Sequence, residues 1–156
     1  MKSLLLDTNV VSLLFKPDHT LHAKCLRIAA GNELLISFMT RAELLLWPRQ
    51  NIWGPNRTKE LSKHIGLFTT LLPDESTCEH WAAIITESRS VGRTITTADA
   101  WIAAAARQWD LPLVTLDYKD FEHLQNLTLV PCRDDPQIQR REIAVDPFRE
   151  QVPESA

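Results

Sequence analysis

Long apolar runs are missing from this 156-residue sequence, and so is any excess of positive charge. The longest apolar stretches, such as residues 4–6 and 102–106, are far shorter than the ~20 residues needed to cross a bilayer. The N-terminus has neither the apolar length nor the small-residue cleavage site of a secretory signal. We therefore expect no membrane segment and a cytoplasmic location.

Basic residues do not dominate: 17 lysines and arginines stand against 20 aspartates and glutamates, for a formal net charge of −3. This balance argues against a protein that holds nucleic acid by bulk positive charge. A phosphate-containing substrate would have to be reached in another way. A divalent metal ion that bridges carboxylates to a phosphate would do so, which directs attention to the acidic residues.

Cysteine is also scarce, with only Cys25, Cys78 and Cys132. Their number is odd, and their wide spacing fits neither a zinc site nor a redox motif. We predict that all three are reduced, inert thiols. Cys25 also follows His19 and His22 at intervals of three, a spacing that we interpret as a solvated helix face rather than a metal site.

The apolar residues that are present, 44% of the chain, suffice for the core of one domain. Beyond residue 132 the sequence becomes polar and proline-marked, without periodicity. We predict a single domain over residues 1–131 and a polar, flexible C-terminal tail over residues 132–156.

Apolar periodicity predicts strands that alternate with helices. This alternation is typical of an α/β fold with a parallel sheet and right-handed crossovers. Pro48, Gly54 and Pro55 are expected to interrupt the helical pattern. The predicted strands span residues 3–6, 34–37, 113–116 and 127–130, and the predicted helices span residues 9–15, 21–30, 40–47, 59–72, 76–89 and 98–109.

Two aspartates, Asp7 and Asp117, each follow directly on a predicted strand. Ligands of open α/β sheets bind beyond the carboxyl ends of the strands, so both acids would point at one edge. Aspartate is equally suited to cap the helix or turn that follows. The sequence pattern leaves both interpretations open.

Glu43 and Asp99 lie three residues after Thr40 and Thr96, which is the spacing of a helix capping box. Both acids also share a helix face with apolar residues. A carboxylate on a buried face needs a partner, because uncompensated desolvation costs several kcal/mol. Few cations lie nearby in the sequence, so Mg²⁺ or Mn²⁺, which prefer oxygen ligands, is a reasonable partner.

Four stretches carry these acids in order, and together they resemble a known family: LLDTNV at 5–10, RAEL at 41–44, TADAWIAAA at 97–105 and LVTLDYKDF at 113–121. The chain resembles the PIN domain, and within it the VapC-type toxins of type II toxin–antitoxin systems, from residue 3 to about 130. The resemblance implies a three-layer α/β/α fold around a central parallel sheet. It also implies a Mg²⁺- or Mn²⁺-dependent endoribonuclease that cleaves RNA, often as a homodimer, and that is inhibited by a cognate antitoxin protein.

The same resemblance assigns roles to individual residues. The catalytic acids would be Asp7, Glu43, Asp99 and Asp117, of which Asp7, Asp99 and Asp117 would bind the metal. Supporting roles would fall to Thr8, Asn9, Thr115 and Asp120.

RNA contacts are predicted for the densest basic stretch of the chain and a nearby tryptophan: Arg41, Arg49, Trp53 and Arg57. A solvated helix surface explains the three arginines equally well.

Two other functions compete with the nuclease interpretation. A phosphatase with an Asp7 nucleophile, as in haloacid dehalogenase-like enzymes, needs a second acid two residues later, where this chain has Asn9. A catalytically silent interaction module with a PIN fold is the other alternative, and the intact set of four acids argues against it.

Overall fold

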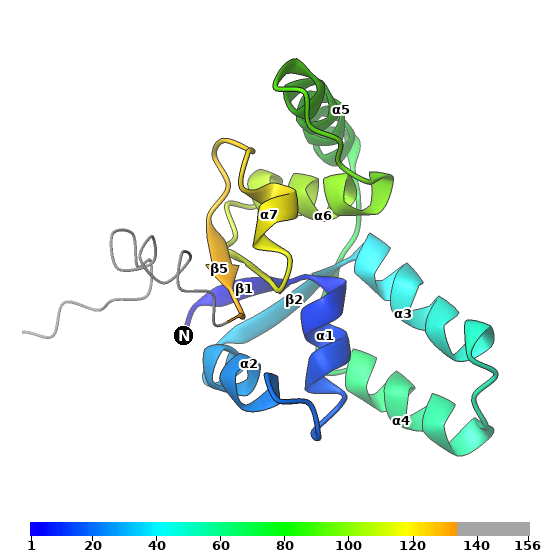
Figure 1. The fold of residues 1–156 in the computed structure, drawn as a ribbon. Coiled ribbons are helices and arrows are strands. Elements are labelled where there is room, and N and C mark those ends of the chain that lie inside the picture. The colour runs from blue at the N-terminus through cyan, green and yellow to red at the C-terminus, as the bar shows by residue number, and fades with distance from the viewer. Residues whose placement is uncertain (134–156) are drawn as a thin grey trace, which may run out of the picture.

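The computed structural model of the protein describes residues 1–133 and contains five strands and seven helices there. The strands are β1 (Ser3–Leu6), β2 (Glu33–Ser37), β3 (Thr69–Leu71), β4 (Leu113–Thr115) and β5 (Leu129–Pro131). The helices are α1 (Thr8–Leu14), α2 (His22–Ala29), α3 (Phe38–Gln50), α4 (Pro55–Ile65), α5 (Glu75–Ser90), α6 (Thr97–Gln108) and α7 (Tyr118–Phe121). All strand pairs are parallel, in the order β3-β2-β1-β4-β5 (Figure 1), which confirms the predicted fold class.

Strand β1 is buried on both faces, as its continuous apolar sequence predicts. Leu4 and Leu6 face a core shared with α1, α2 and α4, whereas Leu5 faces a second core built mainly from the alanines of α6. Figure 1 shows α1, α2 and α4 on one side of the sheet and α5, α6 and α7 on the other. The sheet is therefore the middle of three layers.

The central position of β1 creates a switch point in the sheet. From β1 the chain builds outward through β2 and β3, and it then returns to add β4 and β5 on the other side of β1. The carboxyl ends of β1 and β4 thus lie side by side, with Leu6 paired to Val114. Residues that follow these two strands face the crevice where α/β sheets bind ligands.

The predicted helix over residues 59–72 is wrong in its second half. Helix α4 ends at Ile65, and the edge strand β3 follows at Thr69–Leu71. The apolar spacing from Leu61 through Ile65 to Phe68 continues the helical pattern past the true helix end, and a three-residue strand is too short to show its own period. The four-residue helix α7 was not predicted, for the same reason of length.

Helix α3 begins earlier and ends later than predicted. Strand β2 runs directly into it, because Ser37 both ends the strand and caps the helix through a hydrogen bond to the Thr40 N–H at 3.1 Å. Pro48 lies inside α3 instead of ending it. Its ring is buried and lines a groove with Leu61 and Ile65 of α4, contacts that offset part of the cost of a helical proline.

Cys132 belongs to the folded body, although the predicted tail begins at residue 132. Its side chain is fully buried, and its N–H donates to the Thr115 carbonyl at 2.9 Å, which extends the pairing of β4 with β5. Most of the predicted tail, residues 134–156, lies outside the described residues. Within residues 1–133, no helix is long and apolar enough to cross a membrane.

Candidate active site

Asp7 lies at the end of β1 and is almost completely buried, with 3% of its surface exposed. One carboxylate oxygen accepts the backbone N–H of Thr8 at 2.8 Å, so Asp7 does cap α1. The other oxygen accepts the Thr115 hydroxyl, also at 2.8 Å, from the neighbouring strand β4. Asp7 therefore serves as a cap and also belongs to a buried polar network at the switch point.

Burial raises the pKa of Asp7 to about 7. The hydrogen bonds from Thr115 and Thr8 lower this pKa, but the negative charges of Asp99 and Asp117 raise it further. Within residues 1–133, no lysine or arginine forms an ion pair with Asp7. A carboxylate that is desolvated and close to other acids, without a cationic partner, is typical of functional sites.

Asp117 follows β4 and precedes α7, yet its side chain makes no capping hydrogen bond. Its N–H donates to the Thr115 hydroxyl at 2.9 Å, and its carboxylate accepts the side-chain amide of Asn9 from α1. Thr115 therefore contacts both acids at the sheet edge, as donor to Asp7 and as acceptor from Asp117. The predicted supporting positions Asn9 and Thr115 thus contact the acids.

Glu43 reaches this edge from α3. Since α3 is capped by Ser37 and not by Thr40, the capping-box interpretation of Glu43 is wrong. The Glu43 carboxylate instead accepts the hydroxyl of Thr8 at 2.8 Å, across 35 residues of sequence. Thr8 therefore binds two acids, Asp7 through its backbone and Glu43 through its side chain.

Asp99 lies in the first turn of α6, which Thr96 caps by accepting the Asp99 N–H at 3.1 Å. The capping interpretation is therefore correct for Thr96. The Asp99 carboxyl has a pKa above its ordinary value, chiefly because it is partly buried, while a hydrogen bond with Thr96 acts in the opposite direction. Negative charge on Asp120, Glu43 and Asp117 raises this pKa further.

The four predicted acids and Asp120 are thus electrostatic neighbours at one edge of the sheet, and we call these five residues the acidic cluster. They come from four separate segments of the chain. Within residues 1–133, however, no three acidic, histidine or cysteine side chains lie close enough together to hold a metal ion as they stand. The acidic cluster is a set of repelling carboxylates rather than a finished coordination sphere.

Two buried hydroxyls beside the acidic cluster were missed as site residues. Ser37 and Thr40 are fully buried, and the Thr40 hydroxyl lies 3.0 Å from the Thr8 hydroxyl. From the sequence, Thr40 is predicted only to cap a helix. The available signal was the spacing of three from Ser37 to Thr40 to Glu43, which places all three on one face of a helix.

The predicted RNA-contact residues lie on α3, on α4 and in the turn between them. Arg41 is exposed and donates to the Thr70 hydroxyl at 3.4 Å, near the edge strand β3. Arg49 lines a groove between α3 and α4. Trp53 is half-buried: it stacks on Phe15, and the Arg57 guanidinium lies 3.9 Å from the centre of its ring. RNA contact by these four residues stays a prediction.

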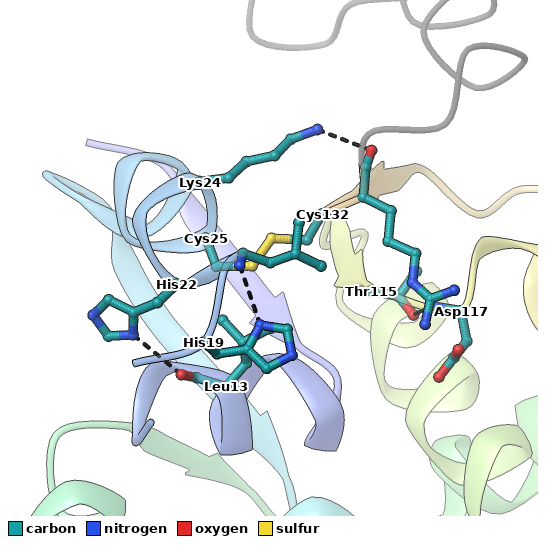
Figure 2. Close-up of a disulfide and its surroundings, with 10 residues drawn as sticks. Leu13, His19, His22, Lys24, Cys25, Thr115, Asp117 and Cys132 are labelled. Atoms are coloured by element: carbon teal, nitrogen blue, oxygen red, sulfur yellow. Dashed lines mark hydrogen bonds between the residues drawn. A yellow bond between two sulfur atoms is a disulfide. The ribbon is translucent and has the colours of Figure 1, made fainter. Parts of the chain in front are cut away.

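The prediction of three reduced cysteines is wrong for two of them. Cys25 of α2 and Cys132 after β5 form a disulfide with 5.8 Å between their Cα atoms (Figure 2), and within residues 1–133 only Cys78 is a free thiol. The separation of 107 positions hides the pairing from any spacing rule. Thr115 and Asp117 lie near the Cys132 end of this bond (Figure 2), where Cys132 is hydrogen-bonded to Thr115. The disulfide therefore lies next to the acidic cluster.

The nearby histidines make local hydrogen bonds. His19 accepts the Leu21 N–H at 3.1 Å, and the His22 ring lies 3.1 Å from the Leu13 carbonyl (Figure 2). Cys25 is buried and bound in the disulfide, so the predicted solvated helix face is wrong for this residue.

The oxygen-rich composition of the acidic cluster suits a hard divalent cation such as Mg²⁺ or Mn²⁺. The carboxyl group of Asp7 tests whether the site fits such a cation. It is buried, its pKa is raised to about 7, and it lacks a cationic partner within residues 1–133. A divalent ion would supply the missing positive charge. The residues present therefore fit such an ion.

Comparison with known proteins places these features in a family. The family model of the PIN domain matches residues 4–127. The chain therefore belongs to the PIN domain family.

The relatives found by sequence and by structure agree with one another. Ribonuclease VapC1 of Haemophilus influenzae (strain R2866) is 28% identical over 128 residues, which cover 79% of this chain and 92% of that protein. FitAcB from Neisseria gonorrhoeae has a TM-score of 0.71 at 25% identity, with 85% of this chain and 98% of that chain covered. VapBC2 from Rickettsia felis, solved bound to a DNA fragment from its promoter, shares the fold, with a TM-score of 0.73 at 22% identity over 84% of this chain and 98% of that one.

Proposed function

We propose that the protein is a divalent-metal-dependent endoribonuclease and the toxin of a toxin–antitoxin pair. The observation that carries this proposal is the convergence of the acidic cluster at the switch point of a PIN fold, with the pKa of buried Asp7 raised to about 7. A relative named as a ribonuclease, VapC1, supports RNA as the substrate. The acids would bind the metal ion, and the ion would in turn bind the RNA phosphodiester, so that no basic surface is required.

We assign metal binding to Asp7, Asp99 and Asp117, with Mg²⁺ or Mn²⁺ as the ion. Negative charge on Asp99 and Asp117 raises the pKa of Asp7, and negative charge on Asp117 also raises the pKa of Asp99. A bound cation would neutralise this repulsion. Because no three of them are close enough to hold an ion as they stand, binding must draw side chains inward. Asp7 is held by two hydrogen bonds, whereas Asp99 is partly exposed to solvent.

When bound, the ion would polarise the scissile phosphate, lower the pKa of an attacking water and neutralise charge in the transition state. The chain's own residues hold the acids ready for that task. Thr115 and Asn9 fix Asp7 and Asp117, and the Thr8 hydroxyl fixes Glu43. Glu43 is then free to accept a proton at its second carboxylate oxygen from a water that attacks phosphorus.

Hydrolysis of this kind leaves a 5′-phosphate and a 3′-hydroxyl on the RNA. A mechanism through the ribose 2′-hydroxyl usually needs a positioned pair of histidines as acid and base. All five histidines fall within residues 1–133, and none of them is hydrogen-bonded there to a carboxylate of the acidic cluster. The termini of the products therefore distinguish the two mechanisms.

An antitoxin partner is supported by the solved relatives, which include toxin–antitoxin complexes such as one from Klebsiella pneumoniae. We infer that it covers the groove between α3 and α4, a hollow of about 580 Å³. Leu45 of α3, which is about half exposed, and Ile52 in the following turn, which is 91% exposed, both line this groove. Large apolar side chains gathered on one surface are typical of a protein contact.

A homodimer, which the family resemblance implies, stays a prediction. Trp81 of α5 and Trp101 of α6 stack on each other with ring centres 5.2 Å apart, and both remain partly exposed. This aromatic pair is the surface where we expect a second copy to pack. Cytoplasmic location also stays a prediction, and a disulfide is more common in oxidising compartments.

The proposed function is tested by RNA cleavage with the purified protein. Mg²⁺ or Mn²⁺ should support cleavage, EDTA should stop it, and Ca²⁺ should restore it poorly because its looser coordination suits in-line attack less well. Asp7→Asn and Asp99→Asn should each lose nearly all activity while remaining folded, whereas the exposed Asp18→Asn should match the wild type.

Sequencing the 5′ ends of cellular RNA after brief expression would identify the substrate and its terminal phosphate. Full cleavage in EDTA, or half the activity in either site variant, would reject the assignment. A folded wild type that cleaves no RNA with any of these ions would instead support a silent interaction module.

A further inference from the structure

Four polar side chains form a continuous chain near the start of α3 that ends at Glu43 of the acidic cluster. The Thr8 hydroxyl oxygen lies 2.8 Å from the Glu43 carboxylate and 3.0 Å from the Thr40 hydroxyl oxygen. The Thr40 hydroxyl lies in turn 3.4 Å from that of Ser37. Thr40 and Ser37 have no exposed surface, so water does not compete for these contacts.

Counting protons fixes the direction of this chain. A hydroxyl group has one proton, so Thr8 cannot donate to Glu43 and to Thr40 at once. The carboxylate is the closer and stronger acceptor, so Thr8 donates to Glu43. Thr40 must then donate to Thr8, and Ser37 to Thr40. All three hydroxyl protons point toward Glu43, an arrangement in which each hydrogen bond strengthens the next.

The Thr40 hydroxyl is not needed to begin the helix. Ser37 is the N-cap of α3, and its hydroxyl oxygen accepts the Thr40 N–H. The partners of the Thr40 hydroxyl in the structure are the hydroxyls of Thr8 and Ser37. The Thr40 hydroxyl therefore interacts with side chains that lead to the site, and it does not cap the helix backbone.

We propose that Thr40 is a positioning residue for Glu43, because its hydroxyl orients the Thr8 proton onto the Glu43 carboxylate. This proposal rests on the proposed nuclease function, since it assigns Glu43 a role in the reaction. Without the Thr40 proton, the Thr8 hydroxyl loses its donor and can turn its own proton away from Glu43. Glu43 would then sample orientations that are unproductive for catalysis.

The central test is Thr40→Val, which removes the hydroxyl while keeping the branched shape, compared with Thr40→Ser and Thr40→Cys. The value of kcat for RNA cleavage should fall about tenfold in Thr40→Val, with little change in KM, because substrate contacts remain. Thr40→Ser should restore kcat, and Thr40→Cys, with a weaker donor, should fall between them. This order follows the strength of the donor and keeps the test valid should Thr40→Val not fold.

Thr77 provides a matched control. Like Thr40 it is a buried threonine at the third position of a helix, but it binds Asp74 at the start of α5, away from the acidic cluster. Thr77→Val should lower the melting temperature and leave kcat unchanged. An equal loss of kcat in Thr77→Val would attribute the effect to stability and overturn the proposal.

Two further measurements separate positioning from general damage. In the Glu43→Gln background, Thr40→Val should cost no further activity, since its effect passes through the Glu43 carboxylate. In metal-free protein at fixed pH, the ¹³C resonance of the Glu43 carboxyl carbon should move in Thr40→Val and stay in place in Thr77→Val. An unmoved resonance together with wild-type kcat would refute the proposal. Because the resonance needs no RNA, it tests positioning even if the wild type cleaves nothing.

Discussion

Asp7 connects the stability of the protein to pH through its buried carboxyl group. Its pKa in the folded protein is raised to about 7, chiefly by burial, against an ordinary value of 3.8. The folded state therefore binds the proton more tightly than the unfolded state between these two values. In metal-free protein, stability is highest at low pH within this window and falls as pH rises toward 7, by about 4 kcal/mol for a shift of this size.

The corresponding prediction is that metal-free wild type melts at a higher temperature at pH 5 than at pH 8. Asp7→Asn should lose most of this dependence, because asparagine still caps α1 but does not ionise. Thermal melts in EDTA across this range provide the measurement, with Asp18→Asn as a control of unchanged slope. A wild type whose stability rises with pH over the same range would contradict the assignment.

A second prediction concerns the contribution of Asp99 to the stability of the metal-free protein. Its carboxyl group faces the negative charges of Asp120, Glu43 and Asp117, so neutralising it relieves repulsion. Because the side chain is partly exposed and screened, we expect Asp99→Asn to raise the metal-free melting temperature by only roughly 2 to 4 °C. The same variant should show a smaller rise on addition of Mg²⁺, since it lacks a ligand.

A capping role for the Asp99 carboxylate predicts the opposite sign. Asparagine interacts less well with the helix dipole, so the variant would melt lower, by an amount that does not depend on metal. Two melting curves, with EDTA and with Mg²⁺, distinguish the outcomes. A destabilised variant that is indifferent to Mg²⁺ would remove Asp99 from the site.

At the level of secondary-structure elements, the sequence predicts long helices well and short helices and strands poorly. Helices α5 and α6 match their predicted ranges to within one residue, because the apolar spacing repeats over three or more turns. Strand β3 and helix α7, of three and four residues, contain no full period and were missed. The start of α3 was misplaced because a serine that ends a strand can also cap a helix without any intervening loop.

The position of some acids in the acidic cluster could be predicted from the sequence, and that of others could not. Asp7 and Asp117 could be placed because the topology of a parallel sheet brings adjacent strand ends together. The link from Thr8 to Glu43 spans 35 residues and depends on how α3 packs against α1, which no local pattern encodes. The pairing of Cys25 with Cys132 is hidden for the same reason.

The disulfide that links α2 to the end of β5 should contribute strongly to the stability of the folded protein. Linking residues 107 positions apart restricts the unfolded chain, an effect worth about 4 to 5 kcal/mol in the entropic model. Reduction with dithiothreitol should lower the melting temperature by roughly 10 °C or more. The exposed Cys78→Ser should keep this shift, whereas the double variant Cys25→Ala, Cys132→Ala should melt low under both conditions. Equal melting of wild type with and without reductant would contradict it.

For the whole molecule, the predicted tail provides the clearest test. Residues 134–156 are polar and rich in proline and lack the apolar periodicity of a core element. We expect a chain that ends after residue 133, and so keeps Cys132, to retain its melting temperature and RNA cleavage within about twofold. Circular dichroism melts and initial cleavage rates give the comparison, and a large drop in either would show that these residues contribute to the folded domain.

The Cys25–Cys132 bond also turns most of the molecule into a closed covalent ring. Glu43, Asp99 and Asp117 lie inside the ring, and Asp7 lies outside it, on the segment that precedes Cys25. A protease that cuts once within the ring, for example at the exposed turn around Ile52, opens the ring but releases no fragment. The nicked protein would run as one band on a non-reducing gel and separate into two only after reduction, so an apparently intact band is no proof of an uncut chain.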